Sequence, residues 1–227
     1  VDIKDGALGY ESDVAKEYSQ TSFESSQNTK EEYKNVIKKL KDEDFYVIGR
    51  IVTFNDELFA VDNPNDCIKD TSGKATKWVS AYSRRAWEYN VKLAIESVEL
   101  FGFNEIQFDY VRFPEASYSW SKNGYDFRNN YKEEKGQTIQ NFLFYAADQI
   151  HEHGAYISAD VFGESTSTYV AAYGHYWPAI SNVVDVISAM PYPDLFAKGY
   201  AGFEIPWEHP YEVVKKWSES AVERQKE

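Results

Sequence analysis

The sequence predicts an α/β fold, specifically a (β/α)8 TIM barrel of which this chain holds an incomplete set of strands. Three observations lead to this prediction: strand and helix patterns alternate, the long loops all follow strands, and no nucleotide-binding fingerprint is present. A complete barrel has eight strands in about 250 residues, whereas five strands are visible in these 227 residues. We expect residues 1–227 to form a single domain.

Strands and helices alternate along the whole chain. The strand segments are rich in apolar and β-branched residues, as expected for strands covered on both faces. The helical segments repeat apolar residues three or four positions apart. Predicted strands occupy residues 1–4, 45–52, 104–113, 155–163 and 183–192, and predicted helices occupy residues 33–40, 80–101, 139–150, 177–180 and 210–221. Such alternation favours parallel strands joined by right-handed crossovers.

Residues with positional preferences mark the ends of the predicted helices. Asn28 and Thr29 are suitable N-caps for the first helix. Gly102 is placed to end the second helix in the left-handed conformation, and Pro210 is placed to open the last one. Residues 11–30 are rich in Ser, Thr and Glu, so we expect them to form an exposed loop.

All the long loops leave the same end of the predicted sheet. The strand-to-helix segments 53–79, 113–136 and 191–210 contain 27, 24 and 20 residues. Long loops in a compact domain are usually functional, and a (β/α) barrel has its active site at the carboxyl ends of its strands. Two of these loops carry many of the aromatic residues, which form 17% of the chain: Tyr118, Trp120, Tyr125, Phe127, Tyr131, Tyr192, Phe196, Tyr200, Phe203 and Trp207.

A doubly wound sheet would also alternate strands with helices. Its nucleotide-binding motifs, GxGxxG and GxxxxGK[ST], are missing from the sequence. We therefore prefer the barrel.

The composition excludes several classes of partner. A formal net charge of −13 argues against nucleic acid, because phosphate backbones are held by Lys and Arg patches. No apolar run approaches the ~20 residues that span a bilayer. The single cysteine, Cys67, cannot form an internal disulfide, which leaves the redox compartment open. The chain starts without Met on an apolar alternation, so we expect the natural product to begin before Val1.

Two aspartates interrupt apolar strands near their carboxyl ends. In 104–113 the two-residue period places Gln107 and Asp109 on one face, with Ile106 and Phe108 directed toward the helices. By the same rule Asp160 lies on the inner face of the next strand. A buried carboxylate is costly unless a partner or substrate compensates its charge.

Paired carboxylates on neighbouring strand ends are the groups that glycosidic bond cleavage requires. Asp109 would act as nucleophile or base and Asp160 as proton donor, while Trp120, Tyr192 and Trp207 offer aromatic faces on which sugar rings stack. The structural alternative is that each aspartate pairs with an inward arginine, for which Arg50 and Arg112 are available.

Other polar residues are candidates for substrate binding. Arg50 ends its strand on the inner face, where it could orient a carboxylate or bind a substrate oxygen. Asp2 and Lys4 share one face of the first strand, and either could bind substrate or join an ion pair there. Gln107 and Arg112 flank Asp109 and are included in the predicted substrate site.

Two further motifs carry weaker signals. Glu164, in the loop after Asp160, is either a second acid candidate or a solvated carboxylate. His151 and His153 form a pair of a kind that binds metals in amidohydrolase barrels. Their place at a helix end, just before Gly154 and opposite the long loops, argues against a metal site.

Five segments together resemble an uncharacterised bacterial family of predicted glycosyl hydrolases: VIGRIVTF, WVSAYSRRAWEYNVKLA, GFNEIQFDYVRFP, ISADVFG and ISAMPYPD. The resemblance covers nearly the whole chain and implies a (β/α)8 barrel distantly similar to the α-amylase and α-galactosidase groups. In those groups the nucleophile is an Asp at the end of the fourth strand. Asp109 takes that position if residues 1–4 are the second strand.

The resemblance also implies parts that this chain lacks. A first strand would precede Val1, and a seventh and an eighth would follow Glu227. A barrel without them would expose two sheet edges and tend to associate, although the oligomeric state stays open. Family membership further implies export or attachment to the bacterial cell envelope.

The leading hypothesis is hydrolysis of O-glycosidic bonds in a poly- or oligosaccharide by Asp109 and Asp160, with no metal or organic cofactor. The first alternative is a carbohydrate-binding barrel without catalysis. The second is a metal-dependent hydrolase, which the ligand-poor strand ends make the weakest of the three. The sequence leaves open the sugar, the linkage and whether configuration is retained.

Overall fold

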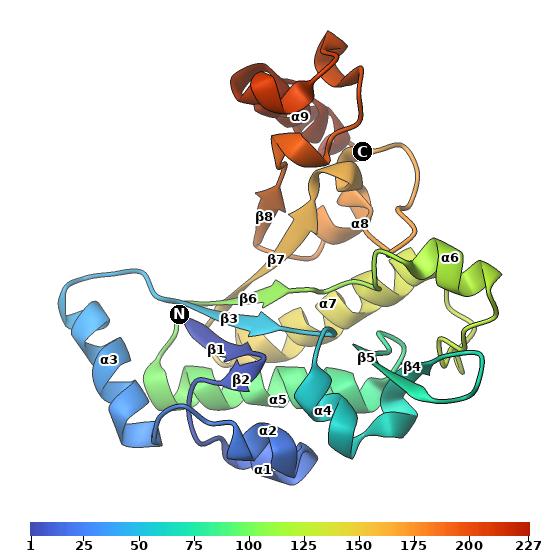
Figure 1. Cartoon of the computed structure of the whole chain (residues 1–227). Coiled ribbons are helices and arrows are strands. Elements are labelled where there is room, and N and C mark those ends of the chain that lie inside the picture. Colours follow the sequence, from blue (N-terminus) through green and yellow to red (C-terminus); the bar gives the residue numbers. More distant parts are fainter.

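A computed structural model describes residues 1–227 and contains one large sheet, mainly parallel, with helices packed against it (Figure 1). The sheet has six strands in the order β2-β1-β3-β6-β7-β8. Their bounds are β1 Asp2–Asp5, β2 Ala7–Leu8, β3 Ile48–Val52, β6 Glu105–Asp109, β7 Tyr156–Phe162 and β8 Val186–Met190. Only β2 runs antiparallel to its neighbour; the other five strands are parallel.

The order of the parallel strands distinguishes a barrel from a doubly wound sheet. Each parallel strand lies beside the parallel strand that precedes it in the chain. A doubly wound sheet instead reverses its order at a switch point. The chain therefore has the fold class of a (β/α)8 barrel with an incomplete set of strands, in which β2 and β8 form the edges of an open sheet.

The five predicted helices are all present. They are α3 Lys30–Asp42, α5 Arg84–Phe101, α7 Lys135–Glu152, α8 Trp177–Ser181 and α9 Pro210–Arg224. Thr29 caps α3 in a capping box with Glu32, and Gly102 ends α5 with a φ of 72°. These local signals were correctly read from the sequence.

Several short elements lie in segments that were expected to be loops. Residues 11–30 hold two helices, α1 Asp13–Tyr18 and α2 Gln20–Glu24, so the prediction of an exposed loop there is wrong. The segment after β3 contains α4 Glu57–Asp62 and a hairpin of β4 Cys67–Lys69 and β5 Ala75–Val79. The short helix α6 Ser117–Lys122 follows β6, and 3-10 turns follow β7 and β8.

The hydrophobic core lies between the sheet and helices α5 and α7. Ile51, Ile106 and Phe108 are fully buried on this face, and Phe108 meets Phe142 of α7 edge to face at 5.2 Å. Full burial of each such side chain contributes about 1.5–3 kcal/mol. Since these residues occupy one set of alternate positions, the other set must face the opposite side of the sheet.

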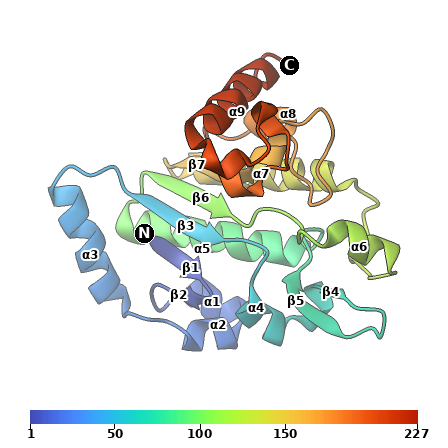
Figure 2. The same cartoon turned by 45° about the horizontal axis from the view of Figure 1, so that its top comes forward.

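The carboxyl ends of the strands carry the long connections. In Figure 2 the arrowheads of β3 and β6 point toward α4, the β4–β5 hairpin and α6. The long loops therefore gather at this edge, as the sequence predicted. None of the helices has the length and apolar character needed to cross a membrane.

Candidate active site

Asp109 is the last residue of β6, and both of its carboxylate oxygens are engaged. Oδ2 accepts hydrogen bonds from Arg50 Nε at 3.1 Å and Nη2 at 2.6 Å. Oδ1 accepts the backbone N–H of Tyr110 at 2.7 Å. Asp109 is only 8% exposed, so the guanidinium supplies the charge compensation that a buried carboxylate needs. Of the two arginines proposed as partners, Arg50 binds it.

The chain turns sharply straight after Asp109. Tyr110 has a φ of 47°, in the left-handed region that bulky residues rarely occupy. Residues held in such conformations cost about 1–3 kcal/mol and cluster at functional sites. Asp109 is thus the last strand residue before this left-handed position.

Arg50 connects Asp109 to the first strand. Its Nη1 donates to Asp2 Oδ1 at 2.7 Å and to Asp5 Oδ2 at 2.9 Å. One guanidinium therefore serves three carboxylates, which leaves the group with an excess of negative charge. Asp2 and Asp5 are more than half exposed, so of the three only the bond to Asp109 is substantially shielded from solvent.

Asp160 lies on β7 in a different environment. Its Oδ1 accepts a hydrogen bond from Gln107 Nε2 at 2.9 Å, and it is 7% exposed. Burial raises the pKa of Asp160 to about 6, and the nearby charge of Asp109 also raises it. Hydrogen bonds from Ser188 and Gln107 lower the pKa in part. A carboxyl with this pKa is partly protonated in mildly acidic solution and can donate a proton.

The structure brings Asp109 and Asp160 to the same level of neighbouring strands. Phe108 pairs with Ala159 in the parallel ladder between β6 and β7, and the two aspartates are the next residues on each strand. Neighbouring strands lie about 4.8 Å apart. The two carboxyl groups are therefore close neighbours on the face opposite the helices.

A cavity of about 540 Å³ lies beyond the carboxyl ends of β7 and β8. Its aromatic lining consists of Phe162, Tyr169, Tyr173, Tyr192, Phe196 and Tyr200. Phe162 lies two residues beyond Asp160 on the same strand face, whereas Asp109 and Asp160 themselves are not among the residues that line the cavity. Tyr192 is the one residue of this lining that the predicted substrate site contained.

Glu164 is held at the cavity wall by two tyrosines. Its Oε1 accepts from Tyr169 Oη at 3.0 Å and its Oε2 accepts from Tyr173 Oη at 2.8 Å. Glu164 is thus an exposed carboxylate whose two oxygens are both held by tyrosine hydroxyl groups. Sequence reasoning missed both tyrosines, because nothing local ties residues five and nine positions away to this side chain.

The other predicted aromatic residues lie outside this cavity. Trp120 stacks on Tyr125 with ring centroids 4.7 Å apart within the α6 region. Trp207 is 56% exposed in the 3-10 turn that precedes α9. Of the three aromatic candidates, Tyr192 alone lines the cavity.

Arg112 is buried instead of reaching the substrate side. Its Nη1 donates to the backbone oxygen of Phe113 at 3.1 Å and its Nη2 to Glu115 Oε1 at 2.7 Å. The guanidinium also lies 4.7 Å from the ring centre of Phe162. Arg112 therefore supports the wall of the cavity and its hydrogen bonds do not go to Asp109.

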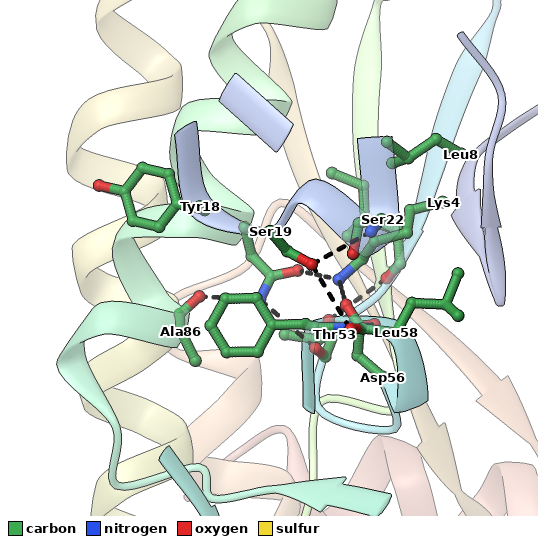
Figure 3. Close-up of polar contacts among 12 residues, drawn as sticks. Lys4, Leu8, Tyr18, Ser19, Ser22, Thr53, Asp56, Leu58 and Ala86 are labelled. Atoms are coloured by element: carbon green, nitrogen blue, oxygen red, sulfur yellow. Dashed lines mark hydrogen bonds and ion pairs between the residues drawn. The ribbon is translucent and has the colours of Figure 1, made fainter. Parts of the chain in front are cut away.

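The prediction that Lys4 shares a face with Asp2 is wrong. A register shift between the two residues breaks the two-residue period of β1 and turns Lys4 toward the helices. Lys4 Nζ lies 2.5 Å from Asp56 Oδ2 and 2.8 Å from Asn90 Oδ1, and the residue is 3% exposed. Figure 3 shows it directed toward Asp56, in a cluster that also contains Ser22. Lys4 is thus buried in this cluster and does not share the face of Asp2 and Asp109.

The two histidines at the end of α7 each have an acidic partner. His151 Nε2 lies 2.8 Å from Asp185 Oδ2, and His153 Nδ1 lies 2.9 Å from Glu99 Oε1. Both residues lie at the carboxyl end of a helix that leads into β7, at the opposite end of the sheet from Asp160.

Comparisons with known proteins identify the relatives of this chain. A family model described as "Putative glycosyl hydrolase domain" matches residues 1–227. A solved hypothetical protein from Ruminiclostridium thermocellum ATCC 27405 is 35% identical, with a TM-score of 0.57 over 71% of this chain and 81% of that one. No curated protein matches the sequence.

Two more distant structures share the fold. The PgaB (BpsB) glycoside hydrolase domain from Bordetella bronchiseptica is 12% identical, with a TM-score of 0.59 over 84% of this chain and 61% of that one. The spore cortex-lytic enzyme SleL from Bacillus cereus is 14% identical, with a TM-score of 0.52 over 98% of this chain. This chain spans only 39% of the SleL chain.

Proposed function

The chain belongs to the family described as "Putative glycosyl hydrolase domain", and from this premise we propose that it hydrolyses O-glycosidic bonds of a poly- or oligosaccharide. In this proposal Asp109 is the nucleophile and Asp160 the acid and base. The family supports a carbohydrate-acting hydrolase, and the arrangement of the two carboxyl groups supports the residue roles.

One observation carries the proposal: adjacent carboxyl groups have opposite surroundings. Asp109 accepts hydrogen bonds from the guanidinium of Arg50, so a negative charge on it has a cationic partner at hydrogen-bond distance. Burial raises the pKa of Asp160 to about 6, which favours the protonated form needed to release the leaving group. Neighbouring carboxyl groups with different surroundings are typical of acid–base pairs in active sites.

The chemistry follows in two steps. Asp160 protonates the glycosidic oxygen while Asp109 attacks the anomeric carbon, which gives a covalent glycosyl-enzyme and the free leaving group. Asp160 then removes a proton from water, which attacks the same carbon and releases Asp109. A covalent intermediate of this kind leads to net retention, for which the two carboxyl groups must lie ~5–5.5 Å apart.

The cavity beyond β7 and β8 would bind the sugar chain. Aromatic side chains form much of its wall, and the Phe196 and Tyr200 rings stack at 4.2 Å to make a continuous apolar surface. The apolar face of a pyranose packs on such rings, while Glu164 at the wall offers a hydrogen-bond acceptor to hydroxyl groups. These features favour a neutral sugar or an amino sugar over a uronic acid.

The test is incubation of the 227-residue chain with neutral and amino-sugar oligosaccharides of both anomeric linkages, with release of reducing ends as the signal. Asp109→Asn and Asp160→Asn should each lower kcat by at least about 100-fold while sugar binding persists. The matched control is Asp148→Asn on the exposed side of α7, which should behave as wild type. Asp109→Gly with azide should form a glycosyl azide if the nucleophile is correctly assigned.

A non-catalytic carbohydrate-binding protein is the second candidate. The observation that favours it is the low exposure of both carboxyl groups, together with the bonding of Asp109 to Arg50. In that case calorimetry would detect sugar binding, no reducing ends would appear, and Tyr192→Ala would weaken binding. Release of sugar that survives both asparagine substitutions would instead contradict the assignment of the two aspartates.

A further inference from the structure

We propose that His175 is a positioning residue that fixes the separation of Asp109 and Asp160 by bridging the ends of β6 and β7. The inference rests on the proposed function, and it assigns a role to a residue that neither the motifs nor the family resemblance indicated. His175 lies in the loop between β7 and α8, far in sequence from β6.

The two aspartates lie just beyond the region where backbone pairing holds their strands together. The register between β6 and β7 runs from Glu105 with Tyr156 to Phe108 with Ala159. Asp109 follows the last pair, and the left-handed Tyr110 then turns the chain away. Each strand end is paired further on its other side, Asp109 with Thr53 and Asp160 with Ser188, so a direct connection between the two ends has to lie beyond the carboxyl groups.

His175 supplies that connection with its two ring nitrogens. The backbone N–H of Phe162 donates to Nδ1 at 3.3 Å, and Nε2 lies 3.3 Å from the backbone oxygen of Val111. Because Nδ1 accepts, the ring proton must be on Nε2, which donates to Val111. Val111 and Phe162 each lie two residues beyond a carboxyl group, one past Asp109 and the other past Asp160.

The turn that holds His175 is itself anchored to the β6 side. Ala171 N–H donates to the oxygen of His175 at 2.9 Å, and Phe113 N–H donates to the oxygen of Tyr173 at 2.8 Å. Gly174 has a φ of 95°, and a Cβ there would lie 3.0 Å from Ile139 Cγ1. The imidazole is thus held in place by a turn that only glycine completes without strain.

The surroundings of His175 keep its hydrogen bonds constant over the working pH range. The residue is fully buried, with the Tyr173 ring edge to face at 5.1 Å and the Phe162 ring at 6.2 Å. Burial lowers the pKa of His175 to about 3, and the charge of Arg112 acts in the same direction. The ring therefore stays neutral, as a residue that both accepts and donates must.

Fixing this distance matters because the carboxyl separation decides how a glycosidase works. Misplacement of a reacting group by about 1 Å can cost roughly 100-fold in rate. The bridge acts on the turnover of bound substrate, since neither ring nitrogen faces the cavity. His175 should therefore affect kcat more than KM.

The experiment replaces His175 by Phe, which keeps a buried ring of similar shape and removes both hydrogen bonds. On the released-sugar assay we expect kcat to fall about 100-fold with little change in KM. As the strand ends separate, Asp160 should lose part of the influence of Asp109, so its pKa and the alkaline limb of the pH–rate profile should move to lower pH. His175→Gln, which can still donate to Val111, should recover part of kcat.

Two controls keep the result decisive. His151→Gln replaces an exposed histidine at the other end of the sheet and should leave kcat and the pH profile unchanged. The pKa of Asp160 is also measured by carboxyl 13C NMR without substrate. This measurement tests the role of His175 even if the chain has no hydrolase activity. A folded His175→Phe variant with wild-type kcat and an unshifted Asp160 pKa would overturn the proposal. Should His175→Phe not fold, equal values for His175→Gln and wild type would overturn it.

Discussion

Asp109 and Asp160 differ chiefly in which neighbour compensates their charge. Asp109 has a cation, Arg50, at hydrogen-bond distance, whereas Asp160 has the neutral amide of Gln107. The two groups are similarly buried, so this difference in partner separates their chemistry. One carboxylate is compensated in the absence of substrate and the other is not.

This contrast predicts how Asp160→Asn changes stability with pH. The pKa of Asp160 rises from 3.8 to about 6 on folding, so between these values the native state binds more protons than the unfolded chain. The contribution of Asp160 to stability is therefore full below the unfolded pKa and is lost as the pH rises through about 6. At pH 8 the Asn variant should be more stable than wild type by about 1–2 kcal/mol after allowance for solvent screening.

Urea unfolding at pH 4, 6 and 8 measures this effect. The advantage of Asp160→Asn should shrink steadily as the pH falls and be small at pH 4, where the native carboxyl is protonated and the pH is close to the unfolded pKa of 3.8. Asp148→Asn, at an exposed position, should give curves that stay parallel to wild type. A constant difference across the pH range would contradict the raised pKa.

At the residue scale the sequence predicted which side chains reach the strand ends and little of what they meet there. Two-residue alternation placed Gln107, Asp109 and Asp160 correctly on one face. The sequence offered two arginines as partners of Asp109 and could not choose between them, because the choice depends on the register between neighbouring strands. His175 was invisible for a similar reason, since both of its bonds join it to distant segments.

At the scale of elements, the buried cluster around Lys4 joins three parts of the chain. Lys4 on β1 contacts Asp56, which caps α4 through Phe59 N–H at 2.9 Å, and Asn90 on α5. Asn90 Nδ2 also donates to the oxygen of Thr53 at 3.3 Å. The cluster therefore fixes the loop after β3 against both the first strand and the long helix (Figure 3).

Removal of the Lys4 charge should be strongly destabilising. Lys4→Met keeps most of the side-chain volume but leaves the carboxylate of Asp56 buried without its cation, which typically costs about 3–5 kcal/mol. Lys38→Met on the exposed face of α3 is the matched control, because the pair of Lys38 with Asp42 is solvent-exposed and worth roughly 0.3–0.5 kcal/mol. Denaturant unfolding of both variants compares the costs; similar values would show that the Lys4 cluster adds no stability of its own.

The predicted helices α3, α5, α7 and α9 were found because each is long enough to display its period. The helix α5 shows apolar spacing over 18 residues and ends at a left-handed glycine. The helices α1 and α2 have only 6 and 5 residues. Their N-caps, Ser12 and Ser19, are present in the sequence, but helices this short show too little apolar periodicity to be predicted. The register shift in β1 made the predicted position of Lys4 wrong, and it cannot be recognised from the sequence of β1.

At the scale of the whole molecule, chain order was sufficient to predict the order of the five parallel strands, whereas the antiparallel edge strand β2 was not predicted. The sequence shows consecutive βα units and no nucleotide motif. This pattern predicts that each parallel strand lies beside the one before it, and the observed order β1-β3-β6-β7-β8 agrees with that prediction. The cavity could not be predicted from the sequence, because its wall is formed by the loops after two different strands. The contacts of its side chains depend on how those loops fold.

The net charge of −13 is also a property of the whole molecule, and it predicts how substrates are discriminated. A negatively charged protein repels polyanions over a Debye length of about 10 Å at 0.1 M salt and about 3 Å at 1 M. A neutral oligosaccharide and its oxidised analogue bearing uronic acids form a matched pair of ligands. The acidic analogue should bind more weakly in dilute salt, and calorimetry should show the gap narrowing as salt is raised, while affinity for the neutral ligand stays constant. Tighter binding of the acidic analogue in dilute salt would show that a local cation such as Arg50, and not the overall field, governs recognition.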